Sequence, residues 1–163
     1  MGWSEDTTSY LTFAENDYRW FKDSYESGSY YPGLAGLGQN ICERYLKHLI
    51  NEYYEPENEA EEHRQVDTLR THSLTKLVRF IEREMGIDIP EEIEDKLYSI
   101  DGFYFSTRYP GDESMIPGER DIDRVAKAVT AVRNYTLDLI HSFEHETTQE
   151  PQDMNNMYDD WER

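Results

Sequence analysis

Cysteine is almost absent from this 163-residue chain, and its one thiol, Cys42, excludes both an intramolecular disulfide and a cysteine-based zinc cluster. Long hydrophobic runs are missing as well, since no apolar stretch approaches the roughly 18 residues that a transmembrane helix needs. The first residues contain neither the basic start nor the apolar segment of a secretory signal peptide. These three absences favour a reducing environment, and we expect a cytoplasmic location.

Basic residues are scarce: 16 lysines and arginines face 35 aspartates and glutamates, which gives a net charge of −19. A field of that sign repels phosphate backbones and anionic lipids, so we expect neither membrane attachment nor nonspecific binding of duplex DNA. The acidic residues gather in two runs, residues 55–62 and 146–162, and a more basic segment lies between Arg64 and Arg83. The net charge therefore excludes an overall basic surface but leaves room for one local anion site.

Apolar residues recur at steps of three and four along most of the chain, which is the spacing of amphipathic helices. Glycine and proline mark where these patterns stop, because glycine is typical of a helix C-terminus and the residue before proline leaves the helical region. Thr71 or Ser73 is a candidate N-cap for the third pattern. Together these signals predict five helices, over about residues 11–28, 31–54, 74–86, 90–109 and 122–143.

The sequence contains no strand pair, no hairpin turn signal and no internal repeat. Five helices joined by mostly short loops predict an all-α fold, an up-and-down helical bundle in a single domain over residues 7–147. The stretch from Glu55 to Arg70 is predicted to be an acidic loop or a poorly ordered excursion. Residues 148–163 are predicted to be an acidic, poorly ordered tail.

One metal-binding pattern is present. Residues His141 to His145 read H-x-x-E-H, in which two histidines one helical turn apart can share a zinc ion. A working site also needs a third protein ligand, and the pattern sits at a helix end beside a polar tail, so we expect solvated histidines and no metal. Nucleotide-binding motifs such as a P-loop or G-x-G-x-x-G are absent too, and no cofactor is predicted.

Two other patches can carry chemistry. Gln39, Glu43 and Lys47 are spaced by four, on one face of the second predicted helix. Taken alone, Glu43 and Lys47 would form an ordinary ion pair on the surface of a helix. Arg108 and Tyr109 form a basic and aromatic pair directly before Pro110, and taken alone Arg108 would cap the last carbonyls of a helix.

The two patches and the segment Thr71-His72-Ser73-Leu74 resemble, in order and spacing, the motifs of the HEPN domain family. The resemblance spans about residues 7–145. It implies a helical bundle that usually forms a homodimer, binds a nucleotide or RNA, and often pairs with a small nucleotidyltransferase protein in a toxin–antitoxin-like system. The ligand-binding residues that it implies here are Arg108, Tyr109, His72, Lys47 and Glu43.

Many members of that family are metal-independent ribonucleases with an R-x(4–6)-H motif, in which histidine acts as acid or base and arginine holds the phosphate. In this chain the arginine is Arg108, and the histidine would fall at Glu113, Ser114 or Met115. None of these is histidine. Ribonuclease activity is therefore not carried over, and no catalytic residue is predicted.

Three functions stay open at this point. The favoured one is a noncatalytic module that holds a nucleotide, an RNA or a partner protein, and an electropositive cleft around Arg108 would support it. The second is a divergent ribonuclease in which His72 replaces the missing histidine, and a close approach of His72 to Arg108 would support it. The third is an interaction module whose acidic surface faces a basic partner.

Overall fold

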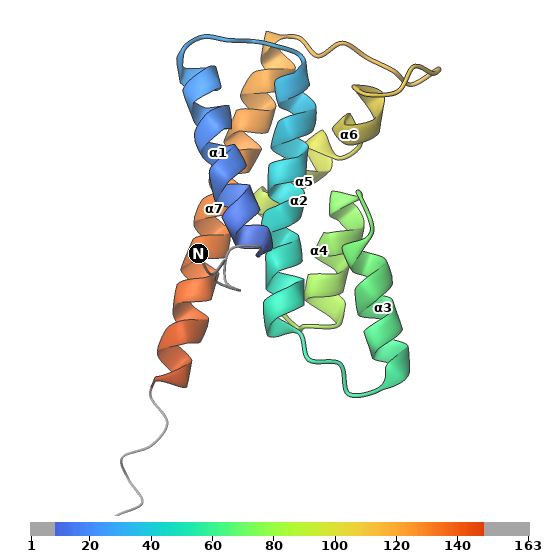
Figure 1. The fold of residues 1–163 in the computed structure, drawn as a ribbon, viewed down its shortest axis with the longest axis vertical. Coiled ribbons are helices and arrows are strands. Elements are labelled where there is room, and N and C mark those ends of the chain that lie inside the picture. Colours follow the sequence, from blue (N-terminus) through green and yellow to red (C-terminus); the bar gives the residue numbers. More distant parts are fainter. Residues whose placement is uncertain (1–8, 149–163) are drawn as a thin grey trace, which may run out of the picture.

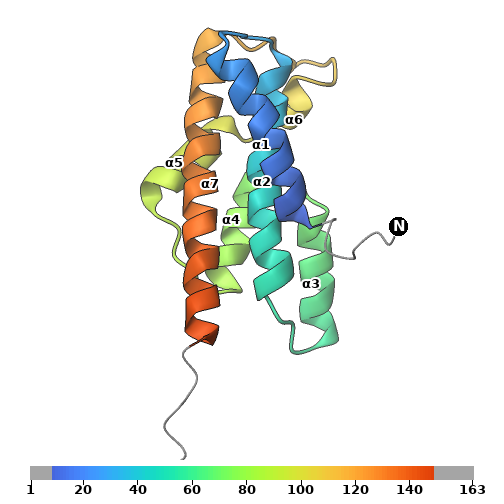
Figure 2. The same ribbon diagram turned by 60° about the vertical axis from the view of Figure 1, so that its left-hand side comes forward.

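The computed structural model describes residues 9–148, and this part of the chain consists of helices joined by turns and loops (Figure 1). The long helices α1, α2 and α7 lie side by side, and α3 and α4 pack beside the C-terminal half of α2 (Figures 1 and 2). The predicted all-α bundle is confirmed. Its helices are α1 (Tyr10–Glu26), α2 (Gly33–Tyr53), α3 (Glu59–Leu69), α4 (Leu74–Arg83), α5 (Glu91–Ile100), α6 (Phe103–Ser106) and α7 (Glu119–Thr147).

Helix α2 is the centre of the bundle and contacts each of the other described helices. Two-thirds of its residues are buried, as expected of a helix that is covered on nearly all sides. Gly38 lets α7 approach closely, because a Cβ atom at this position would collide with Cγ1 of Val125 and lie 3.2 Å from the ring of Phe21. The packing of α2 therefore fixes the positions of its polar side chains as firmly as those of its apolar ones.

The predicted acidic loop between Glu55 and Arg70 is wrong, because most of it forms helix α3. The Asn58 side chain caps this helix by accepting a hydrogen bond of 3.0 Å from the backbone N–H of Glu61. Glutamates in the first turn are favourable because they face the positive end of the helix dipole. None of the residues of α3 is buried, so the apolar stripe that reveals a packed helix is missing.

The predicted single helix over residues 90–109 is wrong as well, because it breaks into α5 and α6. Gly102 has a φ of 99°, in the left-handed region that favours glycine. The carboxylate of the preceding residue, Asp101, reaches the start of α4, where it accepts hydrogen bonds from the backbone N–H groups of Leu74 and Thr75, both at 3.0 Å. Ser73, one of the two predicted caps, is the N-cap of α4. The break lets α6 pack against α2.

The predicted start of the domain, residues 7 and 8, lies outside the described residues, whereas its predicted end, residue 147, is the last residue of α7. All of the predicted tail except Thr148 also lies outside the described residues. Within residues 9–148, no helix is both long and apolar enough to cross a bilayer.

Candidate functional site

Glu43 and Lys47 form a buried ion pair on α2. Nζ of Lys47 donates to Oε1 of Glu43 at 2.6 Å, and the two side chains are only 3% and 7% exposed. The pair is therefore not the ordinary surface pair that its spacing alone would give. Removing two charges from water is costly unless further hydrogen bonds satisfy them, so the other neighbours of Glu43 matter.

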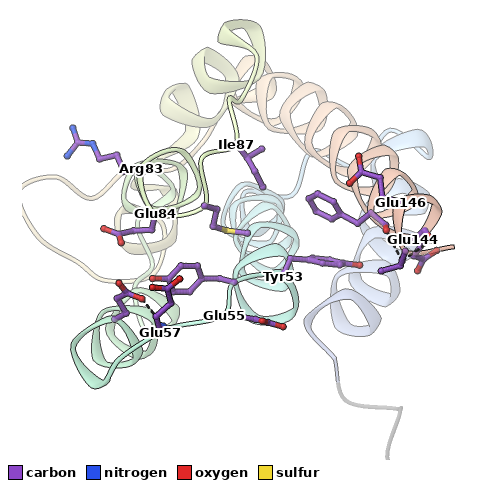
Figure 3. A pocket seen from close by; sticks show the side chains of 13 residues that line it. Tyr53, Glu55, Glu57, Arg83, Glu84, Ile87, Glu144 and Glu146 are labelled. Atoms are coloured by element: carbon purple, nitrogen blue, oxygen red, sulfur yellow. Dashed lines mark hydrogen bonds between the residues drawn. The ribbon is translucent and has the colours of Figure 1, made fainter. Parts of the chain in front are cut away.

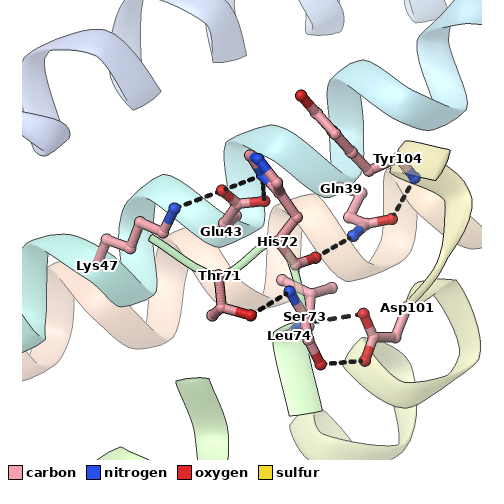
Figure 4. A network of polar contacts seen from close by, with 9 residues as sticks. All are labelled: Gln39, Glu43, Lys47, Thr71, His72, Ser73, Leu74, Asp101 and Tyr104. Carbon is pink, nitrogen blue, oxygen red and sulfur yellow. Dashed lines mark hydrogen bonds and ion pairs between the residues drawn. The ribbon is translucent and has the colours of Figure 1, made fainter. Parts of the chain in front are cut away.

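His72 supplies the second partner of Glu43. Its Nδ1 lies 3.1 Å from Oε1 and 3.3 Å from Oε2 of the carboxylate (Figure 4). A carboxylate accepts hydrogen bonds, so Nδ1 carries the proton and Nε2 of a neutral imidazole is the acceptor. The His72 side chain is 37% exposed, and no described residue forms a hydrogen bond with Nε2. The ring is thus oriented from the inside of the protein while one edge stays open to solvent.

Gln39 holds together the two segments that carry the rest of the site. This fully buried side chain donates from Nε2 to the backbone carbonyl of His72 at 2.9 Å, and its Oε1 accepts from the backbone N–H of Tyr104 at 2.6 Å (Figure 4). The four-residue spacing of Gln39, Glu43 and Lys47 therefore has a structural meaning. The first residue fixes two backbones, the second orients His72, and the third balances the charge of the second.

Aromatic side chains connect His72 to Arg108. The imidazole stacks on the ring of Tyr104, with centroids 4.0 Å apart and planes 9° from parallel. The guanidinium carbon of Arg108 lies over the same ring, 4.2 Å from its centroid. Phe105 lies edge-on to His72, and the centroid of its ring is 6.1 Å from that of Tyr109. The side chains of Phe105 and Tyr109 are more than half exposed. Helix α6 thus presents an aromatic platform between His72 and the Arg-Tyr-Pro turn.

Arg108 does not cap its helix through its side chain. The guanidinium has no hydrogen bond or ion pair with any described residue, and the carbonyl of Phe103 is bonded instead by the Thr107 hydroxyl at 2.5 Å. Gly36 of α2 leaves room for this turn, because a Cβ atom there would lie 2.9 Å from the Thr107 hydroxyl oxygen and 3.8 Å from Nε of Arg108. The capping role that the sequence offered for Arg108 is therefore wrong.

A shallow hollow of about 400 Å³ lies beside the platform. Its lining contains one charged residue, Arg108, and no acidic residue; the lining is Ser106, Thr107, Arg108, Tyr109, Pro110, Ser114, Met115 and Ile116. In a chain of net charge −19, this is a local cationic spot with aromatic and apolar walls.

The five residues singled out from the sequence thus fall into two groups. Arg108 and Tyr109 line the hollow, and His72 reaches Arg108 through the ring of Tyr104. Glu43 and Lys47 are buried against each other and do not line the hollow, so neither reaches it as the ligand-binding residue that the resemblance implied. The residues that the sequence did not single out as ligand-binding are Gln39, Tyr104 and Phe105; only Gln39 had a visible signal, its spacing of four from Glu43.

His141 and His145 lie where the zinc pattern predicts, one turn apart near the end of α7. Their Nε2 atoms are 3.0 Å apart, and both side chains are exposed. Within residues 9–148, no three side chains of the metal-binding types come together around a common point.

A comparison with protein-family models matches residues 8–139 to the HEPN domain. Comparisons with curated proteins and with solved structures gave no significant match. The matched range contains α1 to α6, most of α7 and all five of the residues singled out from the sequence. Because this match covers far more than half of the chain, the protein belongs to the HEPN domain family.

Proposed function

We propose that this HEPN domain is a noncatalytic module that binds a nucleotide or the phosphorylated end of an RNA in the hollow beside α6. The carrying observation is the state of Arg108: its guanidinium has no anionic partner among the described residues, although the chain has 35 carboxylates, and no carboxylate lines the hollow. A planar guanidinium can grip a phosphate through two parallel hydrogen bonds.

The aromatic side chains supply the second half of the recognition. Tyr109 and Phe105 are 58% and 53% exposed, and they lie within reach of a base that leaves the phosphate at Arg108. Stacking of an unpaired base on an aromatic ring is the usual way in which proteins hold single-stranded RNA. Nε2 of His72 adds one hydrogen-bonding atom at the edge of the platform. Glu43, Lys47 and Gln39 act behind it as positioning residues.

The test is fluorescence anisotropy with two probes, a fluorescent ATP analogue and a short 5′-phosphorylated single-stranded RNA. Arg108→Lys is expected to weaken binding by more than tenfold, about 1.4 kcal/mol, because lysine offers a point charge instead of a planar fork. The matched control Arg120→Lys changes an exposed arginine outside the hollow and should leave the affinity unchanged. No binding by the unaltered protein, with a melting temperature lowered by several degrees in Arg108→Ala, would make Arg108 a structural residue and overturn the proposal.

A divergent ribonuclease is the second candidate, and one observation favours it: His72 and Arg108 contact the same ring, that of Tyr104. A histidine oriented by a buried carboxylate is suited to proton transfer, and a nearby arginine to holding phosphate. The test is cleavage of a single-stranded RNA in the presence of EDTA. Cleavage that disappears in His72→Ala would establish this candidate, and binding without cleavage would support the noncatalytic module.

The assembly in which the module works is also part of the proposal. We propose a homodimer that pairs with a small nucleotidyltransferase protein in a toxin–antitoxin-like system, as the family resemblance implies. Apolar side chains at the mouth of the hollow support a protein interface there, since Ile116 is 85% exposed and Met115 lies beside it. Light scattering should give about twice the chain mass of 19.4 kDa at micromolar concentration, and a monomer would contradict the dimer.

A further inference from the structure

A larger cavity lies at the other end of α2, away from Arg108. It has a volume of about 890 Å³ and is formed by the ends of α2, α4 and α7 and by the start of α3 with the loop before it (Figure 3). Its apolar lining consists of the side chains of Tyr53, Tyr54, Met85, Ile87 and Phe143. Tyr53 and Phe143 come from different helices and pack with ring centroids 4.6 Å apart. The cavity thus has the size and the aromatic lining of a binding groove for side chains of a partner.

The rim of this groove is strongly acidic. Six glutamates line it, contributed by three separate parts of the chain: Glu55, Glu57, Glu61, Glu84, Glu144 and Glu146. The one basic lining residue, Arg83, extends away from the other lining side chains in Figure 3. Arg64 lies 3.5 Å from Glu84 and 4.0 Å from Glu61. The other four glutamates have no ion-pair partner within residues 9–148.

The negative field reaches the groove's aromatic lining. Burial raises the pKa of the Tyr53 hydroxyl, and the charges of Glu144 and Glu52 raise it further. Burial and the charges of Glu61 and Glu84 raise the pKa of Tyr54 in the same way. An occupant of the groove must therefore bring positive charge to the rim together with apolar surface for the lining.

We propose that this groove binds a cationic segment of another protein, in which lysines or arginines flank an apolar anchor residue that packs against Tyr53 and Phe143. Charge complementarity selects this occupant. A second copy of the chain carries a net charge of −19, and residues 149–163 contain five acidic residues and one basic residue, so neither complements the rim. Nucleic acids and anionic lipids are repelled by the same glutamates. The groove shares no lining residue with the hollow at Arg108, so this interaction does not depend on nucleotide binding.

Three fluorescently labelled peptides of equal length test the proposal with the full chain by anisotropy. The first has lysines and arginines around a central phenylalanine, the second replaces the phenylalanine by serine, and the third replaces every basic residue by glutamate. The first is expected to bind, the second at least tenfold more weakly, and the third not at all. Equal affinity of the first two peptides would show that the groove's lining is not used, and would overturn the proposal.

Variants then locate the site. Changing Glu55, Glu57, Glu144 and Glu146 together to glutamine should weaken binding of the first peptide at least tenfold. The matched control changes four exposed glutamates elsewhere to glutamine and should weaken it less than twofold; these are Glu26, Glu91, Glu92 and Glu113. Both variants have the same net charge, so an equal loss in the two would mean diffuse attraction by the whole chain and would overturn the proposal.

A photo-crosslink provides a readout that does not depend on folding of a variant. With benzoylphenylalanine in place of the central phenylalanine, the crosslink is expected on the segment around Tyr53 or on the end of α7 around Phe143. A crosslink on α6 or on the loop after it would place the peptide in the other hollow and would contradict the assignment to this groove.

Discussion

Nδ1 of His72 lies 3.1 Å from Oε1 of Glu43, an oxygen that also accepts a hydrogen bond of 2.6 Å from Nζ of Lys47. The buried Glu43 carboxylate therefore accepts hydrogen bonds from two groups, the buried ammonium of Lys47 and the imidazole of His72, which reaches the surface. The lysine balances the charge of the carboxylate, and the histidine receives its orientation from it. This arrangement converts a polar face of α2 into the support of a surface site.

Breaking the buried pair on one side should be strongly destabilising. Glu43→Gln leaves the Lys47 ammonium buried without a carboxylate, and we expect a loss of about 3 kcal/mol in the free energy of unfolding. The double variant Glu43→Gln, Lys47→Met removes both charges. Its loss in the free energy of unfolding should be smaller than the sum of the losses in Glu43→Gln and Lys47→Met. Urea unfolding measures both. If the single variants are as stable as the unaltered protein, the pair is solvated and not buried.

Gly38 should not tolerate even a methyl group. A Cβ atom at this position collides with Cγ1 of Val125, so Gly38→Ala is expected to cost about 1–3 kcal/mol of stability through overpacking. Gly111 is the matched control, because a Cβ atom there meets nothing within 4 Å. Adding Val125→Ala to Gly38→Ala makes room for the new methyl group and should recover part of the loss. A melting temperature unchanged in Gly38→Ala would mean that α2 and α7 are farther apart than described.

The Asp101 carboxylate should matter both for stability and for the site. It caps α4 through the N–H groups of Leu74 and Thr75 and through the Thr75 hydroxyl at 2.6 Å, so Asp101→Ala is expected to lower the free energy of unfolding by about 1–2 kcal/mol. Its neighbour Gly102 is the N-cap of α6, so binding at Arg108 should weaken too. Asp23→Ala, an exposed change on α1, should lower the stability much less. Equal effects of the two changes would contradict the capping role.

Glu15 should make part of the stability depend on pH. Burial alone would raise the pKa of its carboxyl, but hydrogen bonds from Arg133 and Tyr45, at 2.8 and 2.6 Å, outweigh burial and hold this pKa below its ordinary value of 4.5. The folded state therefore binds a proton at Glu15 less readily than the unfolded chain does. The resulting stability is present above pH 4.5 and is lost as the pH falls through the lower pKa of the folded state.

The check is the melting temperature of Glu15→Gln against the unaltered protein between neutral pH and the acid range. The difference in melting temperature between the unaltered protein and Glu15→Gln should be largest above pH 4.5 and should become smaller below it. Asp112→Asn, an exposed change in the loop after α6, is the control and should show no such narrowing. A gap that widens toward acid would mean that the pKa of Glu15 is raised and not lowered.

The sequence by itself determined the helices that bury an apolar stripe, because the three- and four-residue spacing is a property of the chain. It also determined the spacing of Gln39, Glu43 and Lys47 and the three motifs of the HEPN family, and it narrowed the cap of α4 to Thr71 or Ser73, of which the structure has Ser73. It could not reveal α3, which buries no residue and so has no stripe.

Only the tertiary structure decided which polar residues of the site face solvent. At the break between α5 and α6, the Asp101 side chain forms hydrogen bonds with the start of α4, 26 to 28 residues earlier in the sequence. No local sequence pattern can indicate such a contact. The burial of Lys47 within α2 and the exposure of Arg108 after α6 could not be predicted, because each depends on residues distant in the sequence. Their surroundings differ because the lysine pairs with the buried Glu43 carboxylate, whereas the arginine lies over the ring of Tyr104 at the edge of an acid-free hollow.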